Sequence, residues 1–156
     1  MLIESDKRDS PLRLLYKNEN FSVPPNLHII GMMNTADRSL AVIDYALRRR
    51  FGFFNMTPGF SSEGFAQYQA KVDSPTLDSL VEAIGALNLA IADDPALGPG
   101  FAVGHSFVSD APKDDTVDVW LHSVVEDELI PLLQEYWFDE TRKVEEWSGR
   151  LRAAIS

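Results

Sequence analysis

Residues 27–51 read LHIIGMMNTADRSLAVIDYALRRRF, and this stretch decides the fold class. It opens with an almost continuous apolar run, residues 27–33, which is typical of a strand buried on both faces in a parallel sheet. A buried helix is the rival interpretation, but the run is short and is bounded by proline and asparagine. A second apolar run, residues 51–56, predicts another strand. The sequence therefore favours an α/β arrangement in which the first strand ends at Asn34.

A helix is predicted between these two strands, from Asp37 to Arg50. Asp37 is a candidate N-cap, and Thr35 is a second one. Leu40, Ile43 and Leu47 recur at helical spacing, which gives the helix one apolar face. Three consecutive arginines, Arg48, Arg49 and Arg50, stand at its far end.

The flanking sequence predicts a hairpin arm before this stretch and a helical region after it. Residues 1–7 resemble the last turns of a helix, residues 11–16 a strand or hairpin arm, and residues 22–26 a turn. After a break at Thr57-Pro58-Gly59, capping signals and apolar periodicity predict helices over residues 64–72, 74–92, 116–137 and 140–154, with a short extended piece at 101–108. Within the third of these helices, Pro131 predicts a kink or an interruption. We accordingly expect two domains, 1–57 and 58–156.

Composition narrows the possible functions. Fourteen Lys and Arg residues stand against 24 Asp and Glu residues, so the net charge is −10, which disfavours this chain as the main DNA- or membrane-binding surface. The sequence contains no cysteine, which excludes disulfides and thiolate chemistry and fits a reducing cytoplasm. No signal peptide and no membrane span is predicted. The three histidines are scattered, so we expect no metal site.

Two features suggest nucleotide chemistry. Asn34 is predicted at the carboxyl end of a parallel strand, where α/β folds bind ligands, and its amide can hold a water in line with a terminal phosphate. An asparagine in this context is more often a turn residue or a cap. The arginines at 48–50 can act as arginine fingers, but cations at a helix C-terminus also offset the helix dipole.

The stretch from Gly31 to Phe51 resembles the sensor-1 to arginine-finger segment of McrB-type AAA+ proteins, the GTP-hydrolysing motor subunits of restriction systems that cut DNA containing methylcytosine. The flanks agree, since residues 2–8 are similar to the segment after the Walker B strand and residues 21–27 to the lead-in to the sensor-1 strand. Residues 104–107 and 130–137 resemble parts of the helical lid.

The resemblance implies a fold and a set of roles. The fold is the C-terminal portion of an AAA+ P-loop NTPase module, the end of its parallel sheet, followed by a helical lid subdomain. Asn34 would be the sensor-1 residue beside the attacking water, and Asp37 would position it or a residue of an incoming partner. Arg49 and Arg50 would be fingers for the neighbouring subunit's nucleotide, whereas Arg48, by its spacing of four residues from Asp44, could instead pair with that carboxylate. His105 and Ser106, on the lid, would approach the nucleotide, although a plain turn explains them equally well.

The sequence lacks a phosphate loop of the form Gly-x-x-x-x-Gly-Lys-Ser/Thr, and no glycine is followed by lysine. GTP or ATP with Mg²⁺ would therefore be bound mainly by residues outside this chain, and the chain alone is expected to be inactive. The expected partners are further AAA+ subunits in a ring and a McrC-like nuclease, with DNA contacted only through other domains. Two alternatives stay open: a non-catalytic interaction module, and another AAA+ remodelling ATPase without a restriction role.

Overall fold

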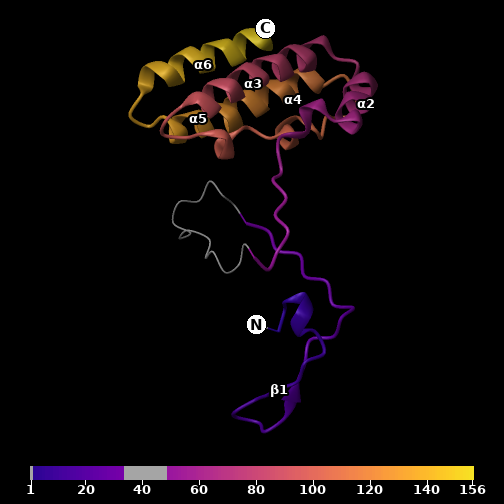
Figure 1. Cartoon of the computed structure of the whole chain (residues 1–156). Helices are drawn as coiled ribbons and strands as arrows, with labels where there is room; N and C mark the ends of the chain where they lie inside the picture. The colour runs from indigo at the N-terminus through magenta and orange to yellow at the C-terminus, as the bar shows by residue number, and fades with distance from the viewer. Residues whose placement is uncertain (1, 34–48) are drawn as a thin grey trace. The chain divides into compact units, whose positions relative to one another are not determined.

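The computed structural model describes residues 2–33 and 49–156, which form two compact units, Met1–Asn55 and Met56–Ser156 (Figure 1). We call them the N-terminal unit and the helical unit and describe each by itself. The prediction that residues 1–57 belong to an AAA+ core and residues 58–156 to a lid subdomain remains a prediction. The helix predicted from Asp37 to Arg50 lies almost wholly outside the described residues.

The N-terminal unit contains a short hairpin. Strand β1, Leu12–Arg13, pairs antiparallel with β2, Asn20–Phe21, with Leu12 opposite Phe21 and Arg13 opposite Asn20. The predicted hairpin arm is thus confirmed. The predicted helix end is shorter than expected and consists of one 3-10 turn, η1, Ser5–Lys7.

The two predicted strands are not formed in this chain. Residues 27–33 and 51–56 have no ladder hydrogen bonds, and the only described sheet is the two-stranded hairpin. Ile30 is 93% exposed, Met32 98% and Phe54 85%, which is the reverse of burial on both faces. A strand of that kind requires a paired neighbour and covered faces, and the described part of this unit offers neither. The prediction was therefore wrong for the chain by itself.

The helical unit contains the helices α2 to α6 (Figure 1). Their bounds are α2 Glu63–Val72, α3 Pro75–Asp93, α4 Val117–Ser123, α5 Ile130–Tyr136 and α6 Thr141–Ala154, with a π-helical segment, η5, over Val124–Leu129 and 3-10 turns η2 Gly59–Ser61, η3 Pro99–Phe101 and η4 His105–Val108. Helix α3 packs against α4 and α6, and α5 packs against α6, so that α3 is the centre of the core.

Helix α3 forms for the reasons that its sequence predicts. The Ser74 side chain accepts a hydrogen bond from the Leu77 backbone N–H, and Pro75 follows at the first helical position, where its missing N–H costs nothing. One stripe of the helix is fully buried, and it consists of Leu77, Leu80, Ile84, Leu87 and Ile91. By length and composition α3 also meets the requirement for a membrane span, a test that core helices of globular domains pass as well.

The predicted helix over 116–137 is divided by a π-helical segment. In η5 the Ile130 N–H donates to the Val125 carbonyl, a bond over five residues rather than four. Pro131 follows directly, so the wide turn relieves the clash between its ring and the preceding turn. The wide turn also explains why buried side chains recur every four residues in this helix. In a regular α-helix each residue advances about 100°, so positions four apart drift by about 40° around the axis at every step, and the wider turn compensates for this drift. The buried side chains that keep this four-residue repeat are Leu121, Val125, Leu129, Leu133 and Trp137.

The extended piece predicted at 101–108 is also wrong, since two 3-10 turns occupy it. This segment is bonded to α3 at Val103. The Val103 N–H donates to Asn88 Oδ1 at 2.6 Å, and the Val103 carbonyl accepts from Asn88 Nδ2 at 2.9 Å. The side-chain amide of α3 takes the place of a neighbouring strand. The loop therefore follows the helix instead of a sheet.

Candidate functional site

The predicted finger arginines that are described lie in a turn at residues 49–50 of the N-terminal unit. The Arg50 Nε donates to the Glu4 Oε1 at 2.5 Å, and the two side chains are 20% and 29% exposed. The Arg50 guanidinium is the main cause that lowers the pKa of Glu4 below its ordinary value. Arg49 is exposed. Arg50 is thus held by its own chain, and reaching a phosphate requires it to exchange the Glu4 carboxylate for the phosphate oxygens.

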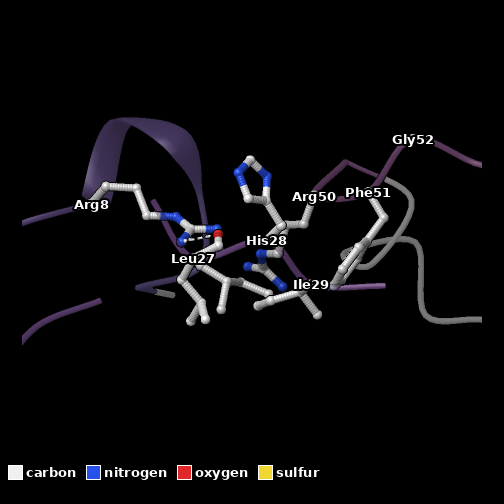
Figure 2. A pocket seen from close by; sticks show the side chains of 8 residues that line it. Arg8, Leu27, His28, Ile29, Arg50, Phe51 and Gly52 are labelled. Carbon is white, nitrogen blue, oxygen red and sulfur yellow. Dashed lines mark hydrogen bonds between the residues drawn. The ribbon is translucent and has the colours of Figure 1, made fainter. Parts of the chain in front are cut away.

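An open cleft of about 250 Å³ lies beside Arg50, and it is lined by residues on either side of η1 and by residues of the two apolar runs (Figure 2). On one side Arg8 Nη1 donates to the backbone carbonyls of Pro24, at 3.2 Å, and Leu27, at 3.0 Å. His28 and Phe51 also line the cleft. The Arg8 guanidinium ties the start of the first apolar run to the segment after η1, so the cleft is a structural junction with a cationic rim.

Asn34 and Asp37, the predicted sensor-1 residue and its positioning partner, lie outside the described residues. Their roles remain predictions.

His105 and Ser106, the predicted lid contacts, are consecutive residues of η4. His105 Nδ1 accepts the Gly59 N–H at 3.0 Å, and the imidazole ring packs edge-on against the rings of Phe60 and Phe65 at centroid distances of 6.1 and 6.0 Å. Ser106 is exposed. The imidazole is therefore engaged inside the helical unit through Nδ1, whereas Ser106 faces solvent.

The helical unit also contains a buried carboxylate, Asp94, which the sequence indicated only as the end of a helix. Asp94 follows α3 and is 7% exposed. Its Oδ2 accepts from Trp137 Nε1 at 2.8 Å and from Lys143 Nζ at 2.7 Å, and its Oδ1 accepts from the Ala96 N–H at 2.7 Å. The Lys143 ammonium, with the Trp137 and Ala96 donors, lowers the pKa of Asp94 to about 2. The sequence signal for this role is weak: an acidic residue directly before Pro95.

Asn88 is the second residue that sequence reasoning missed. It stands four residues after the buried Ile84, so a polar side chain occupies a position near the apolar stripe of α3. A polar residue at a core spacing is the signal that identifies such a group, because it has to be hydrogen-bonded there. Its partner, Val103, could not be predicted from spacing.

The residues described do not offer a magnesium site. Over residues 2–33 and 49–156, no group of three or more His, Asp or Glu side chains is arranged to hold a metal ion. A metal–nucleotide complex therefore does not fit these described residues alone.

Comparison with known proteins identifies both a domain and a relative. Residues 79–145 match the family model of the McrB alpha-helical lid domain. The chain is 42% identical, over 163 aligned residues, to the Type IV methyl-directed restriction enzyme EcoKMcrB subunit of Escherichia coli (strain K12). The alignment covers 97% of this chain and 35% of that subunit, so the chain spans about a third of the length of its curated relative.

Proposed function

This chain belongs to the McrB family, of which it represents the C-terminal part, and on that premise we propose that it supplies the lid and the arginine fingers of a nucleotide-hydrolysing motor subunit. The motor is that of a modification-dependent DNA restriction system. The observation that carries the proposal is the 42% identity over 97% of the chain, which includes the region from Asn34 to Arg50 as well as the helical unit.

The division of labour follows from what the sequence contains. It has no phosphate loop, so a second polypeptide segment binds the phosphates of GTP or ATP and the Mg²⁺ ion. Asn34 orients the attacking water, Asp37 positions Asn34, and Arg49 and Arg50 stabilise charge on the nucleotide of a neighbouring subunit. Such fingers act between subunits, so the working assembly is a cytoplasmic ring, to which a McrC-like nuclease binds. DNA is contacted through other domains.

The exposed apolar runs support a partner of this kind. In the described chain, residues 27–33 and 51–56 leave large apolar side chains in water, and Val23 is the only buried hydrophobic residue of the described part of the N-terminal unit. Contiguous exposed apolar surface marks a binding surface. We propose that both runs become strands of the partner's parallel sheet, which restores the α/β core predicted from the sequence.

A reconstitution experiment tests the function. The chain is mixed with a second polypeptide that carries the Walker A and Walker B segments of an McrB-type protein, and phosphate release from GTP and from ATP is measured in parallel. We expect turnover in the mixture and none by the chain alone, because the phosphate cradle is missing from it. Turnover by the pure chain would contradict the proposal.

The same experiment separates the alternatives. A mixture that assembles in sedimentation but shows no stimulated turnover identifies a non-catalytic interaction module. Turnover with ATP and not with GTP supports another remodelling ATPase, although the match to a restriction subunit favours the McrB-type motor.

A further inference from the structure

The helical unit begins at Met56, and its first helical turn, η2, opens at Gly59 and leads into α2. Whatever fixes the Gly59 backbone therefore fixes the end of residues 56–58, the first residues of this unit. The only side-chain hydrogen bond recorded at that point, within the described part of the chain, is the one that the Gly59 N–H donates to His105 Nδ1, at 3.0 Å.

The contact is steric as well as polar. A Cβ atom built on Gly59 would meet the imidazole at 3.1 Å from Cε1, 3.2 Å from Nε2 and 3.3 Å from Nδ1, so a larger residue there requires the ring to shift by a few tenths of an ångström. Because Phe60 and Phe65 pack edge-on against the same ring, the imidazole has little room to retreat. Glycine at 59 and histidine at 105 thus fit each other.

The backbone that carries the His105 ring is also fixed by hydrogen bonds. The Ser109 hydroxyl donates to the His105 carbonyl at 2.6 Å, and two residues before His105 the Asn88 amide makes both of its hydrogen bonds to Val103. The loop is therefore bonded to α3 at Val103, two residues before the histidine, and the imidazole in turn accepts the Gly59 N–H. Gly59 is thus connected to the buried helix α3 through this loop.

We propose that His105 is a positioning residue that anchors Gly59, and with it the first residues of the helical unit, through Nδ1. The inference does not depend on nucleotide chemistry and goes beyond the proposed motor function. A neutral imidazole that accepts at Nδ1 carries its proton on Nε2. The two ring nitrogens thus separate two roles, since anchoring uses Nδ1, whereas contact with a nucleotide would use Nε2.

Two conservative variants distinguish these roles. The amide oxygen of asparagine can take the place of Nδ1 as an acceptor, whereas the longer glutamine places its amide near Nε2. In the 156-residue chain, hydrogen exchange of the Gly59 amide is measured by NMR for wild type, His105→Asn and His105→Gln. We expect His105→Asn to stay close to wild type and His105→Gln to exchange about tenfold faster, because the Gly59 N–H loses its acceptor.

Controls show whether the helical unit itself is intact. His122→Gln alters an exposed histidine of α4 and is expected to leave Gly59 exchange unchanged. The amides of Ile84 and Leu87 in α3 report the core and should stay protected in every variant. Gly59→Ala keeps both hydrogen-bonding groups but displaces the ring, so it should also accelerate exchange at residue 59.

Equal Gly59 exchange in all His105 variants overturns the proposal, as does faster exchange in His105→Asn than in His105→Gln. In the reconstituted mixture, the nucleotide affinity of the same variants gives a second readout. A nucleotide affinity in His105→Asn equal to that of wild type, beside slow Gly59 exchange, supports a role of the histidine through Nδ1. The exchange measurement uses no nucleotide, so a failure of the motor proposal leaves its result standing.

Discussion

Asp94→Ala is expected to lower the free energy of unfolding of the helical unit by about 3 kcal/mol. The substitution removes the acceptor of a buried indole N–H, the Lys143 ion pair and the hydrogen bond to the Ala96 N–H in one step. A buried donor left without a partner costs more than the lost bond itself contributed. Urea unfolding followed by far-UV circular dichroism measures the change, since the α-helices of the described residues lie in this unit.

The neighbouring residue provides a matched control. Asp93 carries the same charge at the end of the same helix but is exposed, so Asp93→Ala should change the unfolding free energy by less than about 0.5 kcal/mol. Equal effects of the two substitutions would mean that the Asp94 cluster contributes only a surface charge. Asp94→Asn keeps the shape of the side chain and removes its charge, so the loss of unfolding free energy should lie between those of Asp93→Ala and Asp94→Ala.

The same carboxylate makes stability depend on pH. The pKa of Asp94 is about 2 in the folded chain against an ordinary value of 3.8, so the unfolded state binds the proton more tightly. The stabilisation is therefore fully present above about pH 4 and is lost as the pH falls toward 2, by about 2 kcal/mol in total. The slope of stability against pH in this window should be smaller in Asp94→Asn than in Asp93→Asn.

The second large effect is expected in turnover. In the reconstituted mixture, Arg50→Ala should lower kcat by about 10³-fold and change nucleotide affinity far less, because a finger interacts with charge that develops in the transition state. In the described chain Arg50 binds Glu4, so the finger role includes an exchange of partners. Phosphate release under saturating nucleotide gives kcat, and a titration gives the affinity.

Arg13→Ala is the control, since Arg13 is an exposed arginine of strand β1 in the same unit. Equal losses of kcat and affinity in Arg50→Ala would assign Arg50 to the internal ion pair rather than to the finger. Arg49→Ala, measured beside it, decides which of the two arginines acts on the neighbouring nucleotide.

Local signals in the sequence were enough to predict the main helices of the helical unit, but not the 3-10 turns within 99–108 or the π-helical segment. Ser74 and Pro75 mark the start of α3, its apolar residues recur at helical spacing, and the core contains that stripe. Helix α6 and the hairpin arm were equally predictable, since each depends on neighbours within a few residues. The strands at 27–33 and 51–56 were not, because their apolar pattern describes a sheet that this chain does not complete.

The contacts that could not be predicted join residues far apart in the sequence. Asp94 meets Trp137 and Lys143 across 43 and 49 residues, and His105 meets Gly59 across 46, so no periodicity connects them. The roles of Asn34 and Asp37 came from a resemblance and stay predictions, while those of Arg49 and Arg50 await the turnover measurement.

The π-helical segment has a consequence for how this sequence can change in length. Trp137, which donates to Asp94, follows η5 in a register set by a turn that closes over five residues rather than four. Deleting a single residue between Val124 and Leu129 would restore regular winding and rotate everything after it by about 100°, carrying the indole away from the carboxylate. The register of this helix is therefore constrained more tightly than the chemistry of its surface.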